Sequence, residues 1–209
     1  MEMVDILLPP TFENSHKSKT IEQAWNDEDW IGTFNLWIIQ SDPVPSIIYQ
    51  LRSPNSNWAP MKLDVTAGGH YSAGENIEDG LREVREELGK TYDFNKLVNL
   101  GRKVHISPDT KNRERHNVVH IFMTVDNSPL ENYVLQKSEV HAIVSCPINE
   151  LIKVHTQDYS FVAKGLDTEK KSFEIKVDKD SFPYNWDNYH FKIALLTDRL
   201  IKGDKNLIY

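Results

Sequence analysis

The chain has 209 residues, of which 39% are hydrophobic and 26% are charged, and its formal net charge at pH 7 is −7. This length and composition exclude a disordered chain and a membrane-embedded one, and they allow a full hydrophobic core. The excess of negative charge argues against general binding to nucleic acid.

Two further features bear on location. No apolar run approaches the length of a membrane span, and the first ten residues lack the basic and long apolar regions of a signal peptide. Cys146 is the only cysteine, which excludes an intramolecular disulfide framework and fits a reducing cytosol. We therefore expect a cytoplasmic protein, with Cys146 as a buried apolar residue rather than a nucleophile.

The first third of the chain alternates apolar segments with polar breaks. Residues 20–23, Thr-Ile-Glu-Gln, predict a capping box that opens a short helix ending near Trp25. Segments rich in β-branched and aromatic residues predict strands at 32–40, 46–52 and 63–67. The first of them is apolar enough to lie in the middle of a sheet. A polar loop over residues 53–60 separates the second strand from the third.

A glycine-rich loop follows the third strand and leads into a helix. The helix is predicted from Asn76 to Gly89, where the glycine provides a left-handed stop. Gly80 inside it costs about 1 kcal/mol against alanine, so we expect close packing there. The apolar stripe that seats the helix on the sheet consists of Ile77, Leu81, Val84 and Leu88.

The rest of the chain completes an α/β pattern. Residues 97–106 and 117–125 predict two paired strands around a polar loop, 107–116. Further elements are expected as strands at 142–146 and 171–177, and as helices at 147–154 and 188–202. Phe191, Leu195 and Ile201 are expected among the apolar positions of the last helix. Helices and strands alternate unevenly, which favours a mixed sheet between helices over a doubly wound parallel one.

Three carboxylates share one side of the helix predicted from Asn76 to Gly89. Glu83, Glu86 and Glu87 stand at positions i, i+3 and i+4, which lie on the same helix face. Like charges this close repel one another unless a cation lies among them, and hard oxygen ligands suit Mg²⁺ or Mn²⁺ better than zinc. A solvated helix with ion pairs would carry the same glutamates, but it would not need the glycine pair Gly68-Gly69 before it.

The segment from Gly68 to Gly89 resembles the signature of the Nudix hydrolases. That signature is a Gly, five residues, a Glu, seven residues, and then Arg-Glu-hydrophobe-x-Glu-Glu-x-Gly-hydrophobe. In this chain Gly69 is followed by five residues, Glu75, only six residues, and then Arg82-Glu-Val-Arg-Glu-Glu-Leu-Gly89. Lys90 stands where the last hydrophobe is expected. The shorter spacing predicts a smaller role for Glu75 than for the helix glutamates.

The resemblance implies a fold and a domain organisation. Nudix proteins are α/β/α sandwiches in which the motif helix packs against a mixed sheet. We therefore expect one such domain over residues 1–209. An N-terminal extension, about 1–30, and the C-terminal helix, 188–202, should pack on it.

The resemblance also implies metal ligands and a metal-assisted attack of water on a diphosphate. Glu83 and Glu87 should bind Mg²⁺ or Mn²⁺, and Glu86 should be a ligand or a base. A backbone carbonyl at Gly68 or Gly69 is a further ligand by analogy.

Other residues are assigned less directly. Glu139, before the predicted strand at 142–146, is a candidate general base, although a solvated loop carboxylate would look the same. His70 follows the glycine pair and can hydrogen-bond the substrate or the loop. Arg113 and Arg115 form a positive patch with Lys111 on a loop that we expect near the motif helix, where they would bind phosphate oxygens.

The resemblance extends more weakly to a branch related to isopentenyl-diphosphate isomerases, but the catalytic residues of that branch are absent. Gly68-Gly69-His70 replaces the isomerase Cys-Gly-His, and Arg115-His116-Asn117 replaces Glu-x-Glu. Trp30-Ile31 replaces the metal-binding Trp-His. Hydrolysis is therefore favoured over isomerisation.

The expected activity is metal-dependent hydrolysis of a diphosphate linkage in a nucleoside diphosphate derivative or a related organic diphosphate. An isomerase-like enzyme and a catalytically silent diphosphate-binding module remain as alternatives. The expected partner is a small-molecule diphosphate, with neither nucleic acid nor membrane, and a homodimer is left open. Dinucleotides, nucleotide sugars, nucleoside triphosphates and prenyl diphosphates are all compatible substrates.

Overall fold

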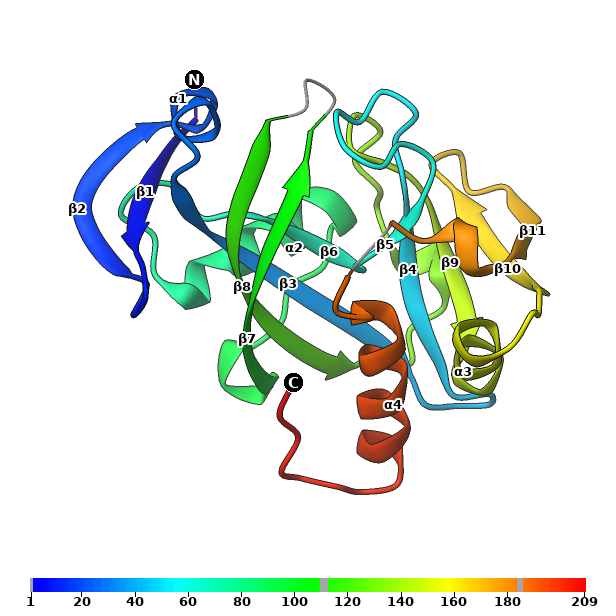
Figure 1. Cartoon of the computed structure of the whole chain (residues 1–209). Coiled ribbons are helices and arrows are strands. Elements are labelled where there is room, and N and C mark those ends of the chain that lie inside the picture. Colours follow the sequence, from blue (N-terminus) through cyan, green and yellow to red (C-terminus); the bar gives the residue numbers. More distant parts are fainter. Residues whose placement is uncertain (1, 110–112, 184–185) are drawn as a thin grey trace.

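The structure is a computed structural model that describes residues 2–109, 113–183 and 186–209. The described residues form one sheet with helices on both faces (Figure 1). The strands are β1 (Met3–Leu8), β2 (Glu13–Thr20), β3 (Trp30–Gln40), β4 (Ser46–Arg52), β5 (Leu63–Asp64), β6 (Ala67–His70), β7 (Val98–Pro108), β8 (Glu114–Val125), β9 (Val140–Pro147), β10 (Phe161–Asp167) and β11 (Ser172–Val177). The α-helices are α1 (Ile21–Asn26), α2 (Leu81–Leu88), α3 (Ile148–Thr156) and α4 (Tyr189–Ile201). The 3₁₀ turns are η1 (Ile77–Gly80), η2 (Phe94–Lys96), η3 (Leu130–Asn132) and η4 (Lys179–Ser181).

Strand β3 is the centre of the sheet, as its apolar sequence predicts. It pairs antiparallel with β1, β4 and β6 and parallel with β8. Beyond β4 the order continues through β9 and β10 to β11. Strands β7 and β8 form a long antiparallel hairpin. The sheet is therefore mixed, as predicted.

The two faces of β3 pack against different helices, which gives the predicted α/β/α sandwich. Phe34, Leu36 and Ile38 belong to the core cluster under α2. Trp37 and Ile39 point the other way, into the cluster that contains residues of α3 and α4. In Figure 1, α4 accordingly lies in front of the sheet and α2 behind it.

Several elements match the predictions closely. Thr20 caps α1 with both hydrogen bonds of a capping box, and β4 spans the predicted residues. α2 ends at Gly89 in the left-handed region, with a φ of 64°. The predicted strand at 63–67 is instead split into β5 and β6, because β5 pairs with β4 and β6 with β3.

Strands β1, β2 and β10 were not predicted, and in β2 and β10 the sequence lacks a continuous apolar pattern. Strand β2 reads Glu-Asn-Ser-His-Lys-Ser-Lys-Thr and is exposed along most of its length. It lies at the edge of the sheet, where it pairs with β1. Strand β10 carries Lys164 and Gly165 in its interior. Pairing with neighbouring strands, rather than local propensity, determines these segments.

Two predicted apolar positions are wrong. Ile77 is 43% exposed, because it lies in η1, where three residues complete a turn and the α-helical stripe does not continue. Leu195 is 40% exposed. The buried face of α4 follows Tyr189, Ile193 and Leu196, at positions i, i+4 and i+7, so Leu195 lies beside it.

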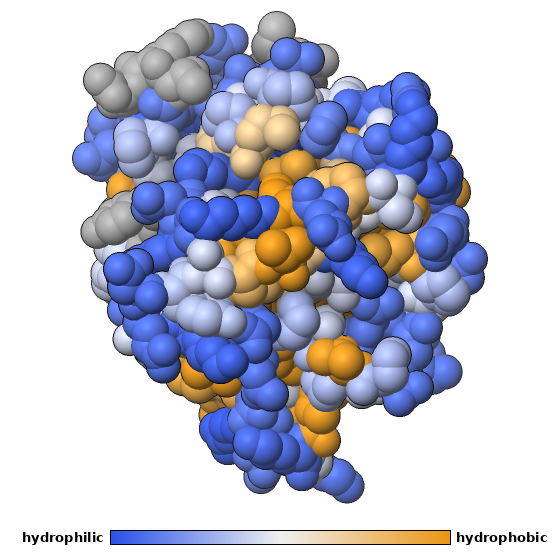
Figure 2. Space-filling view, turned by 90° about the vertical axis from the view of Figure 1, so that its right-hand side faces the viewer, coloured by the Kyte–Doolittle hydropathy of each residue, from blue (hydrophilic) through white to orange (hydrophobic). Residues whose placement is uncertain are grey.

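The molecular surface is mainly hydrophilic. Figure 2 shows the face on the right of Figure 1, where polar residues surround a band of hydrophobic ones across the middle. Among the helices built from described residues, none is long and apolar enough to cross a membrane.

Candidate active site

The glycine loop passes directly over α2. Strand β6 pairs Gly68 with Asn35 and Gly69 with Phe34 on β3, which fixes the loop above the helix. A Cβ atom on Gly69 would lie 2.3 Å from Cδ of Glu83. The Gly68 N–H donates a hydrogen bond of 3.0 Å to Oε2 of Glu87. The close approach of the loop therefore requires glycine and brings its backbone onto the helix glutamates.

Glu83 and Glu87 are buried carboxylates that lack sufficient counter-charge. They are 8% and 3% exposed. Burial raises the pKa of Glu83 to about 7, although Arg82 opposes this shift. Burial and then repulsion from Glu83 raise the pKa of Glu87 well above its usual range. Glu139 adds to the repulsion on both. A cation near these two groups would relieve the repulsion.

Arg82 connects the remaining motif residues. Its Nε lies 2.8 Å from Oε1 of Glu75, and its NH2 lies 3.0 Å from Oε1 of Glu83. Its NH1 lies 3.0 Å from Oε2 of Glu86, and NH2 also donates to the carbonyl of His70 at 3.3 Å. A planar guanidinium holds several oxygens in a fixed geometry. Arg82 thus ties the loop to the helix and orients Glu83.

Glu75 reaches Arg82 although the loop is one residue short. It also accepts a hydrogen bond of 2.7 Å from the Ser72 N–H. The 3₁₀ turn η1, which lies between Glu75 and Arg82, compensates for the missing residue. Four residues of 3₁₀ helix advance about 8 Å and turn about 480°, against about 7.5 Å and 500° for five α-helical residues. The tighter turn therefore makes up for most of the missing residue.

Glu86 differs from its two neighbours. Its side chain is 51% exposed, and its carboxylate pairs with Arg82 on the outer side of the helix. A residue placed there does not line the adjacent cavity, whereas Glu87 does. The three glutamates share a helix face, as predicted, but only Glu83 and Glu87 are buried beside the glycine loop.

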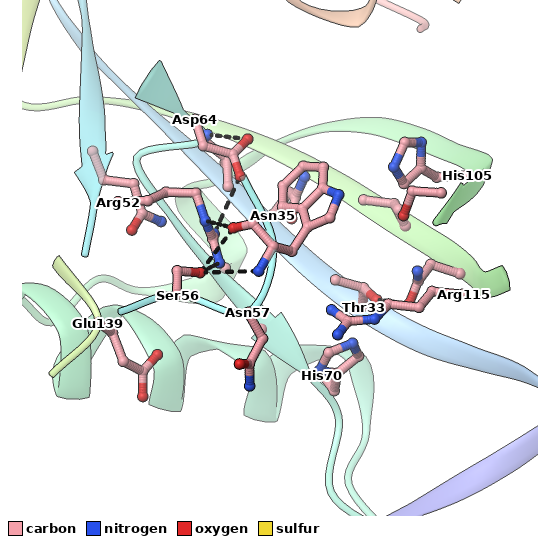
Figure 3. A pocket seen from close by; sticks show the side chains of 18 of the residues that line it. Thr33, Asn35, Arg52, Ser56, Asn57, Asp64, His70, His105, Arg115 and Glu139 are labelled. Carbon is pink, nitrogen blue, oxygen red and sulfur yellow. Dashed lines mark hydrogen bonds and ion pairs between the residues drawn. The ribbon is translucent and has the colours of Figure 1, made fainter. Parts of the chain in front are cut away.

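A cavity of about 490 Å³ opens beside this loop. It lies between the loop at residues 53–60 and the sheet, and strands β3, β7 and β8 all contribute side chains to its lining (Figure 3). Six residues predicted from the sequence line it, namely Gly68, Gly69, His70, Glu87, Arg115 and Glu139. In Figure 3, Glu139 lies toward one end and Arg115 toward the other, with His70 close to Arg115.

Arg113, which was predicted to bind substrate together with Arg115, does not line this cavity. Its Nε donates to Asp109 at 2.8 Å, and its NH1 donates to Oδ1 of Asn26 at 2.6 Å. These bonds tie the β7–β8 hairpin to the end of α1. Lys111, the third residue of the predicted patch, lies outside the described residues.

His70 is held neutral inside the cavity. Burial and, second, the nearby charge of Arg115 lower its pKa to about 4, against an opposing hydrogen bond with Asn117. Its ring contacts that of Trp25 edge to face, with 5.9 Å between the centroids. A neutral imidazole can both donate and accept hydrogen bonds at neutral pH.

Sequence reasoning missed several residues of the cavity. Arg52 ends β4, pairs with Asp64 at 3.3 Å and lies over the Trp58 ring at 5.2 Å. Lys103 and His105 are two residues apart on β7 and point to the same side. Polar residues alternating along an otherwise apolar strand were the available signal. A strand whose polar face covers a cavity gives the same pattern as one that faces solvent.

The residues present fit a divalent cation bound together with a phosphate. Among the described residues, no group of three or more His, Cys, Asp or Glu side chains is placed to enclose a metal ion by itself. Mg²⁺ is usually bound by one or two carboxylates and completes its shell with water and substrate phosphates. Glu83, Glu87 and the backbone oxygen of Gly69 form an all-oxygen donor set of that kind.

Comparisons with known proteins identify the family of the chain. The family model of the NUDIX domain matches residues 34–165, more than half of the chain. An uncharacterized Nudix hydrolase of Clostridium acetobutylicum is 32% identical over 179 residues, which cover 81% of this chain and 85% of that protein.

Two solved structures share the fold. A Deinococcus radiodurans protein matches 72% of this chain and 86% of its own, with a TM-score of 0.53 and 19% identity. A MutT/nudix family protein of Enterococcus faecalis matches 87% of this chain and 70% of its own, with a TM-score of 0.51 and 12% identity. The family model and the clostridial relative together show that the chain belongs to the Nudix family and is a Nudix-type hydrolase.

Proposed function

We propose that the protein hydrolyses a diphosphate linkage in a nucleoside diphosphate derivative or a related organic diphosphate, with Mg²⁺ or Mn²⁺ bound at α2. The observation that carries the proposal is the pair of buried carboxylates, Glu83 and Glu87, under a glycine loop at the edge of a cavity. Like charges buried together are unfavourable without a cation. The cation would be held by these two glutamates and by the carbonyl oxygen of Gly69.

A bound divalent ion would neutralise phosphate oxygens and lower the pKa of a water molecule that attacks the diphosphate. The protein supplies the remaining functions. Arg82 fixes Glu83 and the loop, and it thereby keeps the ligand oxygens in place. Arg52 and Arg115 bring positive charge to the cavity, where they can hold phosphate oxygens. His70, being neutral, can donate to or accept from the substrate.

The roles of Glu86 and Glu139 are part of the proposal. Glu139 lines the cavity and acts as the general base in this account. Glu86 is placed farther out, on Arg82, where it serves the orientation of the motif unless a second ion draws it inward. The two roles predict different effects of substitution. Glu139→Gln should lower kcat with little change in the metal requirement, whereas Glu86→Gln should weaken the response to metal.

A product-release panel tests the proposal. Dinucleotides, nucleotide sugars, nucleoside triphosphates and prenyl diphosphates are incubated with the protein and Mg²⁺, Mn²⁺ or EDTA. Metal-dependent release from at least one class is expected, and Glu87→Gln should abolish it. Release that persists in EDTA would reject the role of the metal, and no release from any class would reject the proposal in favour of a binding module. An isomerase is not supported, because Cys146, the chain's only cysteine, is completely buried in the core.

A further inference from the structure

Arg115 has hydrogen-bonding capacity that the protein does not use. It lies near the start of β8, and its side chain is 12% exposed. Its Nε is buried and has no hydrogen-bond partner in the described part of the chain. A guanidinium has five N–H donors, and a buried donor without a partner costs free energy. The part of the Arg115 side chain that stays accessible lines the cavity, where a ligand acceptor can reach it.

The charge of Arg115 is also incompletely balanced. Its NH2 lies 3.8 Å from Oδ2 of Asp109, which is longer than a hydrogen bond. The same oxygen lies only 2.6 Å from NH2 of Arg113. Burial lowers the pKa of the Arg115 guanidinium, and Asp109 opposes this shift. An added anion would complete the charge balance.

The N-terminal segment fixes the position of this arginine. The guanidinium carbon of Arg115 lies 4.0 Å from the ring centroid of Trp25, a close cation–π contact. The Trp25 Nε1 is itself buried without a partner in the described residues. Trp25 belongs to α1, which precedes the part of the chain that matches the family model, residues 34–165. The extension thus preorganises Arg115 before any ligand arrives.

Arg115 lies well away from the glutamates of α2. Trp30 on β3 pairs with His116, the residue after Arg115, whereas Asn35 pairs with Gly68. Trp30 and Asn35 are five residues apart on β3, which corresponds to about 17 Å along the strand. An extended arginine side chain covers less than half of that length, and a diphosphate group does not bridge the rest. A diphosphate bound beside Glu87 would therefore leave Arg115 to another part of the substrate.

We propose that Arg115, held on Trp25, binds an anionic group on the part of the substrate beyond the scissile diphosphate. The inference rests on the proposed diphosphate hydrolysis. The chemical class is an organic diphosphate with an additional phosphate monoester or carboxylate. Both groups present two oxygens to the guanidinium fork.

Matched compounds separate the two anions. NADP⁺ differs from NAD⁺ by one phosphate monoester, and UDP-glucuronate differs from UDP-glucose by one carboxylate. Binding of all four to the full chain is measured by calorimetry in EDTA, so that no hydrolysis is needed. We expect the more anionic compound of one pair to bind about tenfold to a hundredfold more tightly, the usual range for a hydrogen bond to a charged group. The pair that shows the preference identifies the anion.

Variants test the assignment to Arg115. Arg115→Gln should remove the preference, and Arg115→Lys should keep only part of it, because the charge remains without the fork. Trp25→Phe should retain it and Trp25→Leu should weaken it, since only the former keeps an aromatic face. Arg102→Gln is the control, because Arg102 donates to the carbonyl of Thr11 and does not line the cavity.

Two outcomes would overturn the inference. One is equal affinity within both pairs, or no measurable binding of any of the four compounds. The other is a preference that survives in Arg115→Gln. The same compounds are then assayed for hydrolysis with Mg²⁺. Hydrolysis without a preference would reject the anion site and leave the proposed activity standing. A preference in binding, with no hydrolysis of these compounds or of the other classes in the product-release panel, would reject the activity and leave the site.

Discussion

Gly80→Ala should destabilise the fold without touching the chemistry. A Cβ atom at this position would lie 2.4 Å from Cγ and Cδ2 of Phe34. Phe34 is completely buried, and its ring is stacked on Phe122 with 5.2 Å between centroids, so it has little room to move. Overpacking of this severity costs about 3 kcal/mol, and the better helix propensity of alanine returns about 1 kcal/mol. The net loss is about 2 kcal/mol.

For a chain of this length the loss corresponds to a decrease in Tm of about 4–8 °C. Thermal unfolding followed by circular dichroism measures it. Gly69→Ala is the comparison variant, because the three atoms nearest to the added methyl group all belong to the side-chain carboxylate of Glu83 and not to the core. Its Tm should stay within about 2 °C of wild type, while its activity falls as Glu83 is displaced. A Tm for Gly80→Ala equal to or above that of wild type would refute the packing argument.

Two further predictions concern single carboxylates. Glu75→Gln should reduce kcat by about tenfold, because Glu75 acts through Arg82. This loss should be smaller than that of any substitution of a buried helix glutamate. If Glu75→Gln and Glu87→Gln lose kcat equally, Glu75 lies at the metal. Asp126→Asn should lower the free energy of unfolding at pH 7 by about 1–3 kcal/mol, because Asp126 accepts hydrogen bonds from Ser128, Tyr92 and Lys90. Burial alone would raise the pKa of Asp126, but these hydrogen bonds lower it. The carboxylate therefore contributes fully to stability above the unfolded-state pKa of about 4. This contribution is lost progressively as the pH falls below that value. Urea unfolding at pH 7 and pH 3 checks this. The difference between Asp126→Asn and wild type should be smaller at pH 3 than at pH 7, and an equal or larger difference at pH 3 would contradict it.

The parts of the fold with strong local patterns could be predicted from the sequence. The apolar run of β3 predicted a central strand, and the Thr20 capping box predicted the start of α1. Gly89 predicted the end of α2. In contrast, β2 is a polar edge strand, and only its pairing with β1 defines it.

The candidate site divides in the same way. The spacing of Glu83 and Glu87 places them on one helix face, and this requires no tertiary information. The compensation of the short loop by η1 depends on backbone geometry that residue counting does not contain. The different positions of Arg113 and Arg115 depend on the contact of the hairpin with Trp25, a residue some ninety positions earlier in the chain. Long-range contacts of this kind are not encoded in local periodicity.

The most direct test of the account is the metal dependence of hydrolysis in Glu87→Gln. Glu87 is buried beside the glycine loop, and its removal takes away a proposed metal ligand without opening a cavity in the core. On a diphosphate that the wild-type protein hydrolyses with Mg²⁺, kcat should fall by about 100-fold or more, while the Tm stays near that of wild type. Wild-type turnover in Glu87→Gln, with the same dependence on Mg²⁺ concentration, would contradict the assignment of α2 as the metal-binding helix.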